Sequence, residues 1–140
     1  TGFPFYDVYT CSDGKFMAVG CLEPQFYAEF TRILGIDDDT VPGQFDTDRW
    51  DELRETIAGK FAEKPRDEWA EKFYGTDACT TPVLSYTEAL DHPHIAARET
   101  FVEVAGDVGP APAPRFSRTP AAPVPSAPPR EATAIYQVWA

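Results

Sequence analysis

The pattern of apolar positions changes from strand-like to helical between residues 15 and 34. Residues 16–22 form an apolar run that is typical of a β-strand. Beyond Pro24, apolar residues recur at helical spacing, at Phe26, Phe30, Ile33 and Leu34. Proline fits the first position of a helix, where its missing N–H is not needed. The pattern therefore predicts a strand that passes into a helix at Glu23 and Pro24.

A second apolar strand, over residues 5–11, precedes this one and predicts an antiparallel hairpin. Its residues are mostly aromatic and β-branched. Residues 12–15, Ser-Asp-Gly-Lys, are typical of a turn in which Gly14 takes a positive φ. If all four belong to the turn, Cys11 lies opposite Phe16. In the same register Tyr6 lies opposite residue 21.

Glu23 is predicted at the corner between strand and helix, and two interpretations fit it. As an acidic residue at a helix N-terminus, it complements the helix dipole, an effect of about 0.3–1 kcal/mol. As a functional carboxylate, it lies at the same end of the hairpin as Tyr6 and Leu22, which makes that end a candidate concave site. An ordinary aromatic hairpin end accounts for the same residues.

Helical spacing continues in the middle of the chain. A helix is predicted from about residue 46, with one apolar face made of Trp50, Leu53, Ile57 and Phe61. A shorter helix follows Pro65, carries Trp69 and Phe73, and ends at Gly75. We expect these aromatic side chains to form the core.

Shorter elements are predicted beyond residue 76. A loop leads into an extended segment that ends near residue 84, and the capping box at residues 85–88 opens a short helix. Pro93 begins another helical turn, and two extended segments follow around a turn at residues 105–107. The predicted fold is α+β, a small antiparallel sheet packed against several short amphipathic helices.

Proline dominates residues 110–129, which contain eight of the fourteen prolines and no acidic residue. Such a segment forms neither a helix nor an inner strand, so we expect an extended connector. A short helix is predicted over residues 132–139, where the apolar residues lack a partner within the small domain. The expected organisation is a domain at residues 1–109 and a C-terminal segment at residues 110–140.

The composition limits the classes of function. The 140 residues are 43% hydrophobic, which provides material for a core. A net charge of −11 disfavours nucleic acid as a partner, because such proteins need a basic surface. No apolar run approaches the ~20 residues of a membrane span, so no membrane partner is expected. The chain starts at Thr1 without an initiator Met, which suggests a fragment.

Three cysteines, Cys11, Cys21 and Cys79, do not predict a disulfide framework. The first two lie about five residues apart along the predicted strands, at ~3.3 Å per residue, which is too far for a disulfide. The odd number agrees with a reducing, cytoplasmic location. Cys79 has no local partner base, so a small buried thiol is the preferred interpretation over a nucleophile.

Two other patterns suggest metal binding but are incomplete. Residues 37–39 are three aspartates, yet the spaced ligands of an EF-hand loop are missing, so a solvated loop is preferred. His92 and His94 flank Pro93, but no further histidine or nearby cysteine completes a zinc site. We therefore expect no metal site.

Four segments together resemble the α-methylacyl-CoA racemases, within the family III CoA-transferase superfamily. They are residues 8–27 (VYTCSDGKFMAVGCLEPQFY), 75–84 (GTDACTTPVL), 88–98 (EALDHPHIAAR) and 111–120 (APAPRFSRTP). The match covers most of residues 3–120 in the order of that family. No one of the segments would suffice alone.

The resemblance implies the small domain and C-terminal segment of an enzyme whose large domain is not in this chain. Such enzymes invert the carbon next to a thioester carbonyl, use no cofactor beyond the CoA of the substrate, and form interlocked homodimers. The acid–base pair is a His and an Asp of the large domain. Glu23 matches a supporting glutamate that orients that His across the dimer interface, and Tyr6 and Leu22 match positions beside the acyl group.

Two alternatives to a racemase remain open. A family III CoA transferase moves CoA between carboxylic acids, but the glycine-rich loop that such enzymes tend to carry in this region is missing. A non-catalytic interaction domain would bind a protein through the hairpin end and the C-terminal helix. In any of these cases the chain alone is expected to be inactive as a racemase.

Overall fold

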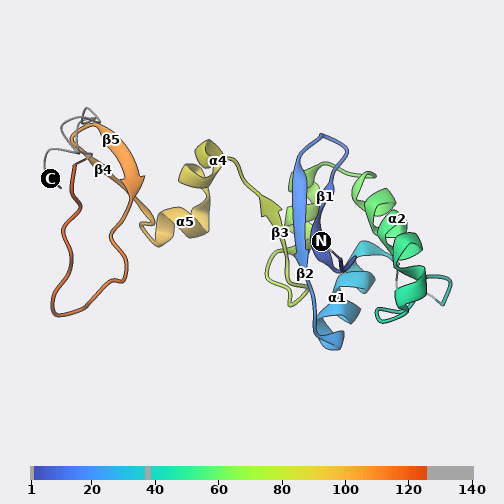
Figure 1. Ribbon diagram of the computed structural model, residues 1–140. Coiled ribbons are helices and arrows are strands. Elements are labelled where there is room, and N and C mark those ends of the chain that lie inside the picture. Colours follow the sequence, from blue (N-terminus) through green and yellow to red (C-terminus); the bar gives the residue numbers. More distant parts are fainter. Residues whose placement is uncertain (1, 37–38, 126–140) are drawn as a thin grey trace, which may run out of the picture. The chain divides into compact units, whose positions relative to one another are not determined.

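A computed structural model describes residues 2–36 and 39–125 and confirms the predicted α+β class (Figure 1). Contacts within the chain divide it into two compact units, Thr1–Val83 and Leu84–Ala140. Strands and helices occur in both units. The sequence predicts a domain boundary after residue 109, whereas these units meet after Val83. The division into residues 1–109 and 110–140 stays a prediction about the intact protein.

The first unit contains a three-stranded antiparallel sheet in the order β1 (Tyr6–Thr10), β2 (Phe16–Gly20) and β3 (Thr80–Val83). The predicted hairpin is present, but its predicted register is wrong by one residue. Tyr6 pairs with Gly20 and Thr10 pairs with Phe16.

The length of the turn explains this difference in register. The Cys11 N–H donates to the Lys15 carbonyl (2.8 Å), so Lys15 belongs to the ladder and only residues 12–14 form the loop. Gly14 has a φ of 76°, and its N–H donates to the Cys11 carbonyl (3.0 Å). A three-residue loop with a left-handed last residue is a common hairpin connection.

Three helices pack on one face of this sheet (Figure 1). α1 (Pro24–Leu34) has the predicted bounds, and Gly35 ends it with a φ of 78°. A 3₁₀ turn, η1 (Thr47–Arg49), precedes α2 (Trp50–Phe61), and α3 (Arg66–Phe73) follows. Their apolar faces match the predicted ones.

The core is mainly aromatic, as expected. Phe61 is completely buried, and its ring lies 5.5–6.3 Å from the rings of Tyr9, Phe30, Trp69 and Phe73. Sheet residues with the opposite orientation line the outer face, because successive side chains of a strand alternate. On that face the side chains of Tyr6, Val8, Phe16 and Val83 are 39–52% exposed.

The second unit contains α4 (Tyr86–Asp91), α5 (Pro93–Ala97), and a hairpin of β4 (Phe101–Val104) and β5 (Asp107–Pro110). The capping box at Ser85 and Glu88 is formed as predicted. None of the described residues from 84 to 125 is buried. Residues 111–125 form no helix or strand, as their prolines predict. The predicted helix at 132–139 lies outside the described residues.

Among the described residues, the helices are all too short and too polar to cross a membrane. The same part of the chain contains no cluster of His, Cys, Asp and Glu that could hold a metal ion.

Candidate functional site

A hollow of about 350 Å³ lies on the outer face of the three-stranded sheet. Its lining includes Tyr6 and Val8 of β1, Ala18 and Gly20 of β2, and Thr81 of β3. The central strand carries small residues here, whereas its neighbours carry larger ones, so the middle of the sheet is hollowed. A Cβ atom at Gly20 would lie 3.6 Å from the Tyr6 ring.

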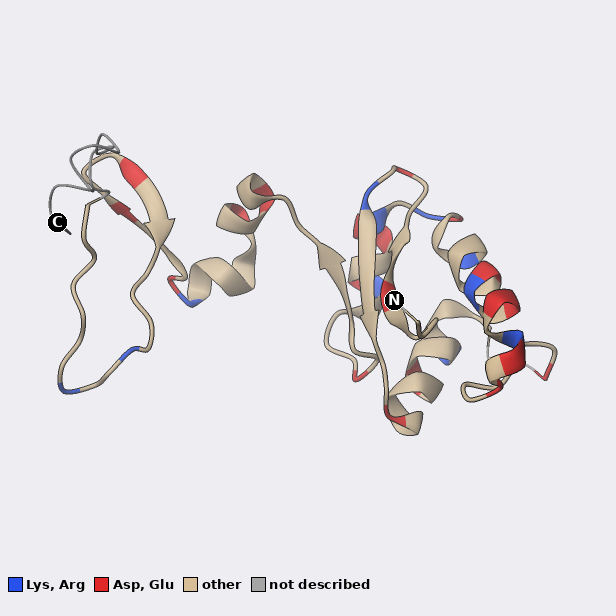
Figure 2. Cartoon of the chain, in the orientation of Figure 1, with Lys and Arg blue, Asp and Glu red and all other residues tan. Residues whose placement is uncertain are grey.

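Asp7 of β1 is the one Asp, Glu, Lys or Arg among the described residues that line the hollow. β2 and β3 contain no charged residue, whereas acidic and basic residues alternate along α2 (Figure 2). An apolar hollow without charged residues on its central strand fits an apolar group rather than an ion.

Cys79 closes one end of the hollow and corrects a prediction. Its thiol is exposed, so the preferred interpretation of a small buried thiol is wrong. The residue precedes β3 with a φ of 47°, a conformation that is uncommon for a residue with a side chain. Its carbonyl accepts a hydrogen bond from the Gly20 N–H (2.9 Å), which extends the pairing of β2 with this segment.

Glu23 lies at the predicted corner between β2 and α1. Its backbone is extended (φ −77°, ψ 140°), as expected for a residue that precedes proline. The Glu23 carbonyl accepts hydrogen bonds from the Phe26 and Tyr27 N–H groups, so the backbone begins the helix. Its side chain makes no capping hydrogen bond. Glu23 is exposed, and its carboxylate does not cap α1.

The charge of the Glu23 carboxylate acts on the Cys79 thiol. Partial burial raises the pKa of Cys79, and the negative charges of Glu23 and Asp77 raise it further. The thiol is therefore protonated at neutral pH, which disfavours Cys79 as a nucleophile.

Gln44 is a residue of this site that the sequence analysis missed. It is 7% exposed, and its side-chain Nε2 donates to the carbonyls of Cys21 (3.2 Å) and Leu22 (2.9 Å), the two residues before Glu23. It lies in a loop between α1 and η1, outside any apolar periodicity, so only its place after Pro42 and Gly43 marks it in the sequence.

Of the three predicted site residues, Tyr6 lines the hollow. Glu23 is not among the described residues that line it, although its charge acts on Cys79, which does. Leu22 is 45% exposed and is not among the described residues that line the hollow.

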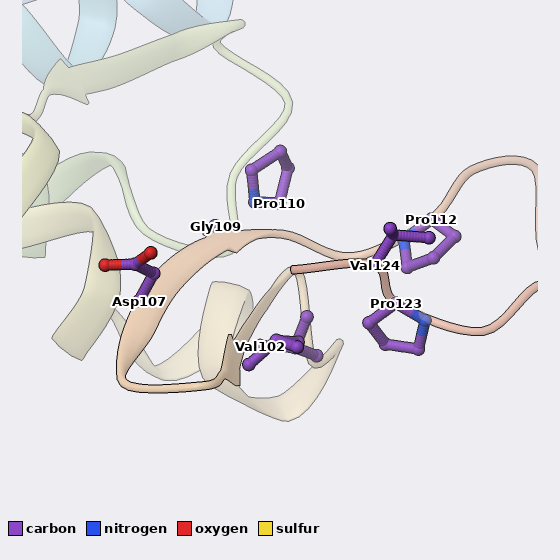
Figure 3. A pocket seen from close by; sticks show the side chains of 8 residues that line it. Val102, Asp107, Gly109, Pro110, Pro112, Pro123 and Val124 are labelled. Atoms are coloured by element: carbon purple, nitrogen blue, oxygen red, sulfur yellow. The ribbon is translucent and has the colours of Figure 1, made fainter. Parts of the chain in front are cut away.

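The two histidines and a smaller hollow do not form a group of residues suited to catalysis. His92 lies between α4 and α5, and His94 is exposed on α5. A smaller hollow of about 110 Å³ lies within the second unit and is lined mostly by valine and proline (Figure 3). Its lining includes only one titratable residue, Asp107, so it offers no pair of groups for acid–base work.

The family model of CoA-transferase family III matches residues 1–132 of this chain. The chain is 46% identical over 123 residues to the α-methylacyl-CoA racemases of Mus musculus and Homo sapiens. It is 32% identical over 115 residues to a CaiB/baiF CoA-transferase family protein of Caenorhabditis elegans. These alignments cover 80–87% of this chain but only 32% of each relative, so the chain spans about a third of their length.

Solved structures show the same fold. A crystal structure of a hypothetical protein from Mycobacterium tuberculosis matches with a TM-score of 0.67 at 15% identity. The match covers 82% of this chain and 34% of the other. At this identity the likeness concerns the fold alone.

Proposed function

This chain belongs to CoA-transferase family III, and we propose that it is the small domain of a racemase acting on 2-methylacyl-CoA thioesters. The observation that carries the proposal is the 46% identity to two α-methylacyl-CoA racemases over 87% of this chain. Under this proposal the rest of the enzyme, which the relatives' greater length allows for, supplies the remaining catalytic groups.

The reaction inverts the configuration at the α-carbon by removing one proton and adding another. One group removes the proton next to the thioester carbonyl, and another returns a proton to the opposite face of the enolate. No electron is gained or lost, so the proposal requires no redox cofactor, and CoA enters only as part of the substrate. Hydrogen-bond donors stabilise the enolate oxygen while the proton is absent.

Glu23 is the residue of this chain that we place nearest to that chemistry. Its side chain is exposed and does not cap α1, so the carboxylate is able to bind a group of another domain or chain. We propose that it accepts a hydrogen bond from a histidine of the large domain in a homodimer. A carboxylate in that role holds the tautomer and the orientation of the imidazole.

The hollow beside Glu23 would receive part of the acyl group. Its walls are apolar near Tyr6 and Val8, and its floor is formed by Ala18 and Gly20. Tyr6 would contact the acyl chain, and the exposed Leu22 would add apolar surface on the way to Glu23. A cytoplasmic location belongs to the same proposal.

The experiment that tests the proposal is exchange of the α-proton of a 2-methylacyl-CoA in D₂O, followed by NMR. The full-length protein should exchange the proton, and this 140-residue chain alone should not. The change Glu23→Gln in the full-length protein should slow exchange by at least about tenfold, as losses of supporting residues commonly do. The matched control Glu55→Gln, at an exposed position of α2, should leave the rate unchanged.

Other outcomes identify the alternatives. A full-length protein that moves CoA onto a second carboxylic acid without exchanging the α-proton would be a CoA transferase. Neither activity in the full-length protein would favour an interaction domain. Exchange by this chain alone would mean that its own residues carry the acid–base pair.

A further inference from the structure

Gln44 is one of the few polar side chains in the core of the first unit. At 7% exposure it is buried together with Thr31 and Arg66. Its amide nitrogen donates both hydrogen bonds to carbonyls of the segment between β2 and α1, those of Cys21 and Leu22. Both partners are carbonyl oxygens, which only accept hydrogen bonds, so the nitrogen of the amide must face them.

The main chain of Gln44 is itself held in place. Trp50, the first residue of α2, donates a hydrogen bond from its Nε1 to the Gln44 carbonyl (2.9 Å). The Trp50 ring also packs against the ring of Phe5 at 6.1 Å. A chain of contacts therefore leads from α2 through Gln44 to the two residues before Glu23.

The opposite side of this corner is held by β3. The Gly20 N–H donates to the Cys79 carbonyl, and Glu23 is followed directly by Pro24. Between these two restraints lie Cys21 and Leu22, whose carbonyls accept hydrogen bonds from Gln44. Without the Gln44 amide, the buried Cys21 carbonyl would need another donor or a different backbone conformation, because buried acceptors are rarely left unsatisfied. The partly buried Leu22 carbonyl would lose the shorter of the two hydrogen bonds.

We propose that Gln44 is a positioning residue for Glu23: its amide fixes the backbone at Cys21 and Leu22 and thereby the place of the Glu23 carboxylate. This inference rests on the proposed function, in which that carboxylate orients a catalytic group. A misplacement of 1 Å at a supporting residue can cost about 100-fold in rate. The role of Gln44 is thus in the rate of the chemical step, with no contact to the substrate.

The test uses α-proton exchange by the full-length protein with three variants: Gln44→Met, Glu23→Gln and the double variant. Met keeps the length and volume of Gln but has no donor. We expect Gln44→Met to lower kcat by about 10–100-fold, as supporting positions do, with KM changed by less than about twofold. The double variant should be no slower than the slower single variant, since both changes act on the same carboxylate.

A matched control separates positioning from loss of stability. Thr31→Val removes another buried hydrogen bond, from the Thr31 hydroxyl to the Ala28 carbonyl (3.1 Å), without touching the corner. Its kcat should stay at the wild-type value even where its Tm falls as far as that of Gln44→Met. If Gln44→Met does not fold, Trp50→Phe replaces it, because this change removes the indole donor to the Gln44 carbonyl and keeps an aromatic ring against Phe3 and Phe5. A lower kcat that is again non-additive with Glu23→Gln is expected.

The overturning results differ from those that overturn the proposed function. If Glu23→Gln slows exchange but the Gln44 or Trp50 effect adds fully to it, or if Thr31→Val loses as much kcat, the positioning role of Gln44 is wrong and the proposed function stands. If the wild-type protein shows no exchange, the proposed function and this inference both fall.

Discussion

Two side chains at the end of the sheet influence each other through charge. The Glu23 carboxylate contributes to the raised pKa of the Cys79 thiol, together with partial burial and Asp77. Cys11 and Cys21 have pKa values of about 11 and about 12, because burial disfavours their thiolates. The thiolate is the reactive form of cysteine. Burial therefore lowers the reactivity of Cys11 and Cys21, whereas partial burial and neighbouring negative charges lower that of Cys79.

Alkylation of this 140-residue chain tests the distance between Glu23 and Cys79. We expect iodoacetamide to modify Cys79 first, since it is the exposed cysteine, at a rate that rises at a higher pH than for an ordinary thiol. Glu23→Gln should lower the pKa of Cys79, because a neighbouring negative charge is removed, and should therefore speed alkylation at a fixed pH. Mass spectrometry of each cysteine over a pH series measures this.

Cys11 and Cys21 serve as internal controls, since their modification reports unfolding rather than charge. An unchanged pH profile of Cys79 in Glu23→Gln would contradict the closeness of the two groups.

At the scale of elements, β1 and α2 are joined by an ion pair as well as by the core. Arg54 of α2 binds Asp7 of β1, and both side chains are partly buried. Burial alone would raise the pKa of Asp7, but the hydrogen bond from the Val8 N–H and the neighbouring positive charges, Arg54 among them, outweigh it and lower the pKa below its ordinary value of 3.8. The charged form is thus favoured in the folded chain.

The ion pair gives a pH-dependent contribution to stability. Because the folded pKa of Asp7 is lowered, its contribution is present above the unfolded pKa and is lost as pH falls through the folded pKa. Asp7→Asn should cost about 1 kcal/mol at pH 7 and progressively less below about pH 4. Urea unfolding of both proteins at several pH values measures the difference, and an equal loss at pH 7 and pH 2 would contradict it.

The helices meet the sheet at Phe61, whose ring contacts those of one strand residue and three helical residues. Phe61→Ala should destabilise the first unit by about 3–5 kcal/mol, because it removes a fully buried ring and leaves a cavity. The control Tyr74→Ala, at a side chain that is 85% exposed, should change stability by less than about 0.5 kcal/mol. Chemical denaturation followed by circular dichroism compares them; equal losses would place the core elsewhere.

At the scale of the whole molecule, the two units differ in how they bury apolar surface. The buried hydrophobic residues of the described chain all belong to the first unit, from Phe5 to Ala78. The described part of the second unit has helices and a hairpin but no buried residue. Burial of apolar surface is the main favourable term in folding, so the first unit carries the stability of this chain.

Truncation measures that asymmetry. A chain of residues 1–84 should unfold with a free energy within about 0.5 kcal/mol of that of the 140-residue chain, because the buried hydrophobic residues that the structure describes all belong to the first unit. A chain of residues 84–140 should show no cooperative unfolding transition. A large loss of stability on truncation would show that the second unit supports the first.

Some features of the fold could be predicted from the sequence, and others could not. The bounds of α1 and the capping box of α4 were predictable because Pro24, Gly35 and Ser85 act on their own backbone neighbours. The register of the hairpin was not, because whether Lys15 joins the loop or the ladder depends on one hydrogen bond. Cys79 is exposed and has a positive φ, and no neighbouring residue in the sequence predicts this conformation.

The candidate site shows the same limit at longer range. The sequence by itself determined the α+β class, the aromatic core, and the place of Glu23 at the start of α1, because periodicity and proline act over a few residues. Only the tertiary structure decided that Gln44, 21 residues beyond Glu23, binds the carbonyls of the two residues before Glu23. It also decided that the charge of Glu23 raises the pKa of Cys79. Such contacts join segments far apart in the chain, and their geometry comes from how helices and sheet pack around the core rather than from any local pattern.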